Sequence, residues 1–356
     1  MPRLIPSFST LFPPDHPPCY DIFVIDIFGV LHDGCSTYSD AVPALRALTS
    51  RARTVLLSNS SRTGPQIVAE LERKHSIRRH DYHDIITSGD TTKAFLIEAL
   101  EAHRTKGTTE YTESFHPAPD FDTLGDADAR AFATHHLHTL NFYLLGTAEY
   151  HSSIYTALPA LTLSLDLTLC DFVFLGAVIP LLPNDQLDLQ SEASVRRHYD
   201  SFLLQCRELN LPMVCANPDV FSPQGEGILH IGSGYVARMY EEAGGKVLYF
   251  GKPCRRVYEQ VMKVVGEGKR ERIVCVGDNL ETDVKGAVEA GLDVIWVAGG
   301  VHEAAIHGEL VAGEGGKKSV GNLQEAEAEE LEAALERVCK KFDGAKSTYF
   351  VRYLKW

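Results

Sequence analysis

Three features that would point away from a soluble enzyme are missing from this sequence. Basic residues are in the minority, 34 Lys and Arg against 48 Asp and Glu, and the formal net charge is −14. Proteins that bind nucleic acids need clustered Lys and Arg to replace counterions on phosphates, so this charge argues against such a partner. No apolar run approaches the ~18 residues of a membrane span, and residues 1–20 lack the apolar block of a signal peptide. We therefore expect a cytoplasmic protein with no nucleic-acid or membrane partner.

The cysteines lack the pattern of a metal or redox motif. None of the eight belongs to a C-x-x-C pair, and several lie in apolar runs, such as Cys275 in Ile-Val-Cys-Val. Buried, reduced thiols are the interpretation that we favour, with disulfides as the alternative.

What the sequence does contain is an alternation of apolar runs and helical patterns. At 356 residues the chain is long enough for two domains, and a hydrophobic fraction of 44% suffices for a sizeable core. Near the start, Asp21–Asp26 and Thr54–Ser58 are short apolar runs that end in polar residues, as buried parallel strands do. Helical patterns at Ala41–Arg51 and Pro65–His75 follow these strands. The order strand, helix, strand, helix indicates an α/β fold.

The same alternation returns late in the chain, and a second α/β block lies between. We predict a doubly wound, Rossmann-like parallel sheet from residues 1–100 and 246–356, interrupted by an inserted α/β domain at 101–245. The further strands are expected at 247–250, 272–276, 294–297, 142–145, 172–175 and 212–216, and the further helices at 254–266, 283–290, 194–209 and, as an acidic amphipathic helix, 324–341.

Residues 101–140 are polar, rich in His, Asp and Thr, and without a clear period. We interpret them mainly as an irregular insertion. His135, His136 and His138 are compatible with a metal site, but histidines in a polar segment are more often solvated, and we favour that interpretation.

Carboxylates follow two of the predicted strands. Asp26 ends the first strand, and Asp278 follows the strand at 272–276, with Asp283 five residues further on. In an open parallel sheet, ligands bind at the carboxyl ends of the strands where the strand order reverses. Carboxylates that converge there are costly to bury unless a cation neutralises them, and oxygen ligands suit Mg²⁺. The sequence therefore predicts a magnesium site.

A second set of polar residues suits an anion. Ser58 and Asn59 end the second strand ahead of a helix N-terminus, and Lys252 follows the run at 247–250. A hydroxyl, an amide, helix N–H groups and a lysine together make a phosphate-sized cradle. Each of these residues alone is as compatible with a cap or a turn.

Taken in order, these segments resemble the four motifs of the haloacid dehalogenase-like (HAD) hydrolase superfamily. Finer features are similar to its subfamily IIA, the NagD and para-nitrophenyl-phosphatase-like group, in which a type-C2 cap is inserted where we expect the middle domain. The segments that carry this resemblance are Leu57–Thr63, Ile86–Gly89, Cys215–Asp219, Gly244–Pro253 and Gly277–Gly291.

The resemblance implies a role for each matching residue. Asp26 would be the nucleophile that forms an aspartyl-phosphate and would also ligate Mg²⁺. Asp278 would complete the metal site, with Asp283 beside it as a direct ligand or through water. Ser58 and Lys252 would hold phosphoryl oxygens, and the cap residues Asn217 and Asp219 would face the substrate.

One position departs from the family pattern. Phosphatases of this superfamily read Asp-x-Asp, and the second Asp transfers protons, whereas here the third residue is Phe28. The metal needs only a backbone carbonyl at this position, which Phe28 retains. Loss of acid/base assistance costs ~10²–10⁴-fold in rate, which would leave a slow phosphatase or one restricted to substrates with good leaving groups. His32 could substitute as acid or base, although a structural histidine is the alternative that we favour.

Two functions follow. The first is Mg²⁺-dependent hydrolysis of a small phosphorylated metabolite, slowed by Phe28. The second is a non-catalytic protein that binds a phosphorylated ligand or a partner through the same pocket. A homo-oligomer remains an alternative to a monomer.

Overall fold

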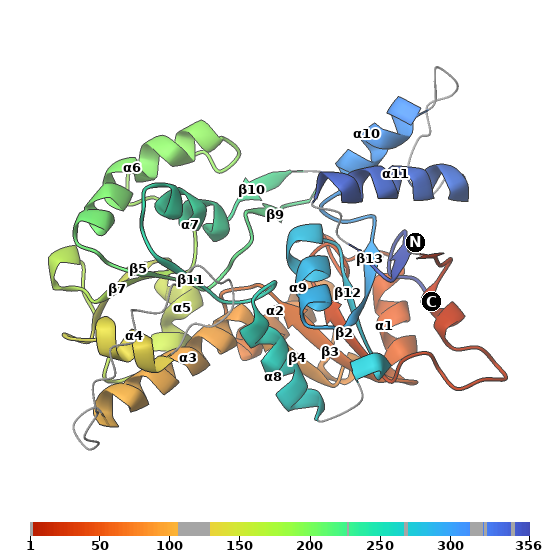
Figure 1. The fold of residues 1–356 in the computed structure, drawn as a ribbon, viewed down its shortest axis with the longest axis horizontal. Helices are drawn as coiled ribbons and strands as arrows, with labels where there is room; N and C mark the ends of the chain where they lie inside the picture. The colour runs from red at the N-terminus through yellow and green to blue at the C-terminus, as the bar shows by residue number, and fades with distance from the viewer. Residues whose placement is uncertain are drawn as a thin grey trace.

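The computed structural model describes residues 3–105, 129–225, 228–266, 270–313, 323, 326–342 and 346–356. Figure 1 shows two bodies, each built on a sheet with helices packed against it. The larger sheet has the order β1-β14-β13-β12-β2-β3-β4 and the smaller sheet the order β11-β8-β7-β5-β6. Neighbouring strands are parallel in both sheets, so the predicted α/β fold class is confirmed.

The strand order of the larger sheet reverses between β2 and β12. From β2 the chain moves outward through β3 and β4, and on the other side of β2 it moves outward from β12 through β13 to β14. Ligands of open α/β sheets bind at such a reversal. The strands are β1 Arg3–Leu4, β2 Ile22–Asp26, β3 Arg53–Ser58, β4 Asp84–Thr87, β12 Ile273–Gly277, β13 Asp293–Val297 and β14 Tyr349–Val351.

Helices cover both faces of the larger sheet, because successive residues of its strands point to opposite faces. Val24 of β2 belongs to the core that includes helices α8 to α11, whereas Phe23 and Ile25 belong to the core that includes α1 and α2. A doubly wound sheet results, as predicted. The helices are α1 Ala41–Thr49, α2 Gly64–His75, α8 Arg255–Val265, α9 Lys285–Glu289, α10 Glu303–Gly313 and α11 Ala328–Lys341.

The smaller sheet also has a core on each face. Helices α6 and α7 contribute to one core, and α3, α4 and α5 contribute to the other. A short antiparallel hairpin, β9 Phe221–Pro223 and β10 Leu229–Ile231, lies between β8 and α7 in the chain. The other elements are α3 Ser88–Thr105, α4 Ala129–His135, β5 Asn141–Leu145, α5 Ala148–Tyr155, β6 Thr162–Leu163, β7 Phe172–Leu175, α6 Glu192–Glu208, β8 Met213–Cys215, α7 Ser233–Glu242 and β11 Val247–Tyr249.

Strand β11 corrects the prediction that residues 247–250 belong to the larger sheet. It pairs in parallel with β8 of the smaller sheet, and Phe250 packs against Phe95 of α3 in the same body. The proposed boundary at 245/246 therefore lies one strand too early. An apolar three-residue strand fits the edge of either sheet, and only the neighbouring strand decides between them.

The predicted irregular insertion at 101–140 is partly helical. Helix α3 continues to Thr105 and α4 covers Ala129–His135, while residues 106–128 of the predicted insertion lie outside the described part of the chain. The sequence showed no amphipathic period in residues 101–140 because each of these helices contributes only a few residues to that segment.

The cysteines agree with the expectation of unpaired, mostly buried thiols. The eight cysteines are unpaired, and six of them are buried. None of the helices in the described residues has the length and apolar character that a membrane span requires.

Candidate metal and phosphate site

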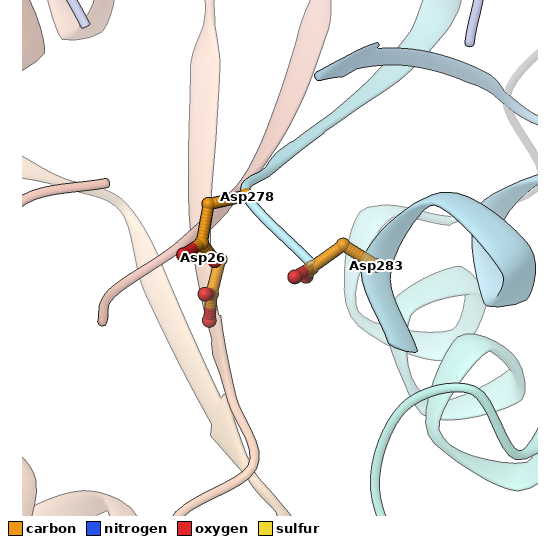
Figure 2. A group of neighbouring side chains, drawn as sticks. All are labelled: Asp26, Asp278 and Asp283. Atoms are coloured by element: carbon orange, nitrogen blue, oxygen red, sulfur yellow. The ribbon is translucent and has the colours of Figure 1, made fainter. Parts of the chain in front are cut away.

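Three aspartates meet at the reversal of strand order. Asp26 is the last residue of β2, Asp278 comes directly after the neighbouring strand β12, and Asp283 lies in the π-helical turn that precedes α9. One carboxylate oxygen from each lies within 4.8 Å of the others. Figure 2 shows the side chain of Asp283 pointing from its helical turn toward the two carboxylates at the strand ends. We call Asp26, Asp278 and Asp283 the acidic trio.

Lys252 supplies the cation that the structure places among these carboxylates. Its Nζ donates hydrogen bonds to Asp26 Oδ1 at 2.5 Å and to Asp283 Oδ1 at 2.7 Å. Burial alone would lower the pKa of Lys252, but the charges of Asp26 and Asp283 raise it above its ordinary value. The lysine is therefore charged at neutral pH.

The acidic trio carries more charge than one lysine balances. The exposed fractions of Asp26, Asp278 and Asp283 are only 7%, 4% and 4%. Burial, followed by the charge of Asp283, raises the pKa of Asp26 and raises that of Asp278 to about 8. Three carboxylates against one ammonium leave two negative charges when all are ionised, which is the charge that a divalent cation balances. The donor set, all oxygen, fits Mg²⁺.

Glycines allow bare backbone to pack directly on these carboxylates. A Cβ on Gly29 would lie 1.9 Å from Asp278 Oδ2, and one on Gly300 would lie 2.1 Å from the same oxygen. A Cβ on Gly277 would lie 2.2 Å from Cγ of Asp283. Gly29 follows Phe28, so the backbone predicted to offer a carbonyl to the metal passes beside the trio. Ligation by the Phe28 carbonyl stays a prediction.

Asn59 has a different role from the phosphate contact that we predicted for its side chain. Its Oδ1 accepts from the backbone N–H of Lys252 at 2.7 Å, and its Nδ2 donates to the backbone carbonyl of Lys252 at 3.0 Å and to Asp219 Oδ1 at 2.8 Å. Both amide hydrogens are thus used, and none is left for a phosphate. The side chain of Asn59 instead fixes Lys252 and ties the site to Asp219.

A cavity of about 410 Å³ opens above the acidic trio. The larger body contributes Ser58, whose Oγ accepts from the N–H of Ser60 at 3.1 Å. The smaller body contributes Asn217 and Asp219, whose contact with a substrate stays a prediction. Phe28 also lines the cavity. The structure therefore brings together all the predicted site residues except His32.

His32 is a buried structural histidine, and its predicted catalytic role is wrong because the ring does not line the cavity. The ring stacks on His75 at 3.9 Å, and its Nδ1 accepts from the N–H of Gly34 at 3.0 Å. Burial, together with His75, lowers the pKa of His32 to about 3. The imidazole is neutral and hydrogen-bonded, which is the alternative that the sequence already favoured.

The histidines of the 101–140 segment form no metal site in the described part of the chain, where the acidic trio is the one cluster of this kind. His135 and His138 are exposed, and His138 Nε2 lies 3.1 Å from the carbonyl of His135. The solvated interpretation of these two residues is confirmed.

Contacts between the two bodies surround the cavity, and the sequence did not indicate them. His151 of α5 is fully buried, and its Nε2 lies 3.0 Å from Ser61 Oγ in the loop after β3. Beside it the guanidinium of Arg62 lies 5.2 Å from the ring centroid of Tyr150. The Ser-Ser-Arg run after Asn59 was the available signal, but its partners on α5 lie far away in the sequence.

Comparisons with known proteins agree with this geometry. Residues 23–108 match a family model described as haloacid dehalogenase-like hydrolase, and residues 249–326 match one described as HAD-hydrolase-like. Together the two segments carry the acidic trio, Ser58 and Lys252. In these two segments the chain is similar to haloacid dehalogenase-like hydrolases.

Individual relatives share about a third or less of their residues with this chain over the aligned segments, as the following three examples show. The chain is 34% identical over 92 residues to the dihydroxyacetone phosphatase of Corynebacterium glutamicum, which covers 26% of this chain and 33% of that protein. The match thus spans about a third of that relative's length. A haloacid dehalogenase-like hydrolase from Brucella suis has a TM-score of 0.61 and 27% identity over 80% of this chain and 90% of its own. A glycerol phosphate phosphatase from Mycobacterium tuberculosis, solved with magnesium, has a TM-score of 0.51 and 22% identity over 81% of this chain and 71% of its own.

Proposed function

We propose that this protein is a Mg²⁺-dependent hydrolase of small phosphate monoesters that acts through an aspartyl-phosphate on Asp26. The observation that carries the proposal is that the acidic trio and Lys252 together line a cavity of about 410 Å³. A cavity of this size suits a small metabolite. Named phosphatases among the relatives support the same class of reaction.

The residues of the trio would hold the metal ion. Asp26, Asp278 and Asp283 offer carboxylate oxygens from three separate segments, and the Phe28 carbonyl is the further ligand that we propose. Bound there, Mg²⁺ would neutralise the trio and draw charge from the phosphoryl oxygens of the substrate. A side chain at any of the three glycines beside Asp278 and Asp283 would collide with these carboxylates.

Asp26 and Lys252 would carry the chemistry of the phosphoryl group. A carboxylate oxygen of Asp26 attacks phosphorus, the bond to the leaving oxygen breaks, and water later releases phosphate from Asp26. Lys252, fixed at both of its backbone groups by Asn59, places its charge where the transition state spreads negative charge over the phosphoryl oxygens. Ser58 Oγ would donate to one of these oxygens.

The alternative is a protein that binds a phosphorylated ligand without turning it over. Phe28 favours it, because the ring stands where phosphatases of this type have a proton-transferring Asp. The ring packs edge-on against His32 with centroids 4.5 Å apart, and the lowered pKa of this buried histidine keeps it neutral.

Phosphate release from a panel of phosphorylated metabolites, measured with and without Mg²⁺, separates the two functions. The hydrolase requires Mg²⁺-dependent release that Asp26→Asn abolishes, since an amide is a poor nucleophile of the same shape. Equal rates in wild type and Asp26→Asn would reject this assignment. Vanadate that binds with Mg²⁺ while no panel member turns over would establish the binding function instead.

A further inference from the structure

The missing proton donor at position 28 has a candidate replacement across the cavity. The carboxyl groups among the described residues of the lining are the acidic trio, Glu70 and Asp219. The trio would be taken by the metal, and Glu70 forms ion pairs with Arg62 and with Lys74. Asp219 is the remaining carboxyl, with neither a metal-ligand role nor an ion pair among the described residues.

Asp219 is held toward the reaction centre by a short chain of hydrogen bonds. It lies in the loop between β8 and β9, and its Oδ1 accepts from Asn59 Nδ2 at 2.8 Å. Asn59 also binds the backbone of Lys252, whose Nζ lies 2.5 Å from Asp26. Among the contacts of the described residues, Oδ1 of Asp219 accepts one hydrogen bond and Oδ2 accepts none, and Asp219 lines the cavity.

We propose that Asp219 transfers the protons that Phe28 cannot, an inference that rests on the phosphatase function proposed above. In the first step Asp26 attacks phosphorus, the bond to the leaving oxygen breaks, and that oxygen takes the proton of the Asp219 carboxyl. In the second step water attacks the aspartyl-phosphate, the bond between phosphorus and Asp26 breaks, and Asp219 takes a proton from the water. Phosphate leaves and both residues return to their starting states.

The electrostatic surroundings of Asp219 suit a group that must both give and accept a proton. Enclosure by protein raises the pKa of Asp219 to about 6, the charge of Asp283 acts in the same direction, and the bond from Asn59 and the charge of Lys252 oppose it. An acid or base works best when its pKa lies near the operating pH. A carboxyl with an ordinary pKa of about 3.9 would seldom carry a proton at neutrality.

Besides Asp219, the smaller body contributes two titratable residues to the described lining, Tyr150 and, as the one imidazole, His230. His230 lies on β10, whereas Asp219 is joined through Asn59 to Lys252 and thus to Asp26. The geometry therefore favours Asp219.

The first test is Asp219→Asn, because asparagine keeps an oxygen for the Asn59 bond and loses only the proton. With 4-nitrophenyl phosphate, whose leaving group needs no proton, we expect a burst of one 4-nitrophenolate per active site followed by turnover slowed ~10²–10⁴-fold. With an alkyl phosphate no burst should appear, since the first step is slow as well. The wild-type pH profile should also lose its limb near pH 6 in this variant.

A second variant separates proton transfer from a merely structural contact. Phe28→Asp combined with Asp219→Asn should recover at least ~10-fold of the lost turnover, since it restores a proton-transferring carboxyl beside Asp26. A defect in Asp219→Asn without the burst, with an unchanged pH profile and without recovery, would show that Asp219 only holds the two bodies together. A burst in His230→Gln instead would assign the role to His230.

The outcomes distinguish this inference from the function on which it rests. One outcome refutes the inference alone: wild type shows Mg²⁺-dependent release that Asp26→Asn abolishes, but the turnover of Asp219→Asn stays within ~3-fold of wild type. Loss of acid/base assistance would cost far more than this. If wild type releases no phosphate from any substrate, the proposed function fails and the inference fails with it.

Discussion

Gly29 offers the sharpest test of how backbone packing holds the acidic trio. Its φ of +75° lies in the left-handed region, and an added Cβ would stand 1.9 Å from Asp278 Oδ2. Ordinary contact begins at about 3.5 Å, so Gly29→Ala must displace this carboxylate by roughly 1.5 Å. Metal ligands tolerate only about ±0.2 Å. The left-handed backbone adds a cost of ~1–2 kcal/mol to folding.

Gly291→Ala is the matched control for this change. Gly291 has a φ of +70°, but nothing lies within 4 Å of an added Cβ. Both variants should therefore lose ~1–2 kcal/mol of unfolding free energy through backbone strain, and only Gly29→Ala should lose the metal site.

Thermal unfolding with and without Mg²⁺ measures the difference. Mg²⁺ at 100 times its dissociation constant stabilises a folded protein by ~2.7 kcal/mol. Wild type and Gly291→Ala should show this rise, and Gly29→Ala should show less than ~0.5 kcal/mol, because binding at least ~100-fold weaker leaves little stabilisation at the same concentration. An equal Mg²⁺ response in all three proteins would refute the view that Gly29 lets the backbone enclose Asp278.

Two further predictions concern pH and the contact between the two bodies. Without metal, the pKa of Asp278 in the folded protein is raised to about 8, above the value of about 3.9 in an unfolded chain. The protonated Asp278 therefore stabilises the fold fully below pH ~4, and this stabilisation is lost as the pH rises toward ~8. Mg²⁺ should therefore raise the Tm more at pH 8 than at pH 5.5, and a larger response at pH 5.5 would contradict this. His151→Ala should lower the unfolding free energy by roughly 2–4 kcal/mol in urea, because it empties a buried site and removes the contact with Ser61. The exposed His135→Ala should change it by less than ~0.5 kcal/mol, and equal effects of the two would count against a structural role for His151.

The sequence was most informative about residues whose position depends on the strand that they follow. Apolar runs that end in Asp26, Ser58 and Val276 identified parallel strands, and the order of the runs placed the polar residues at their ends along one edge of a sheet. That edge is where the acidic trio lies in the structure. The spacing from Asp278 to Asp283 was enough to predict that the two carboxylates meet, because one turn of helix links the two residues.

Features that depend on distant partners could not be predicted in this way. β11 is as apolar as any strand of the larger sheet, and only its pairing with β8 assigns it to the smaller one. His32 has a sequence position compatible with catalysis, but its ring stacks on His75 and is not among the residues that line the cavity. Asn59 looked like a phosphate ligand because nothing local shows that Lys252 and Asp219 use both of its amide hydrogens.

The central claim is that Asp26 takes up the phosphoryl group. Acid quenching during turnover of a radiolabelled phosphate monoester with Mg²⁺ tests it directly. We expect the label on the peptide that contains Asp26. The bond to the label should be stable in acid and cleaved by hydroxylamine, as an acyl phosphate is. We expect no label in Asp26→Asn. Label on another residue, or release of phosphate by Asp26→Asn at the wild-type rate, would contradict the account.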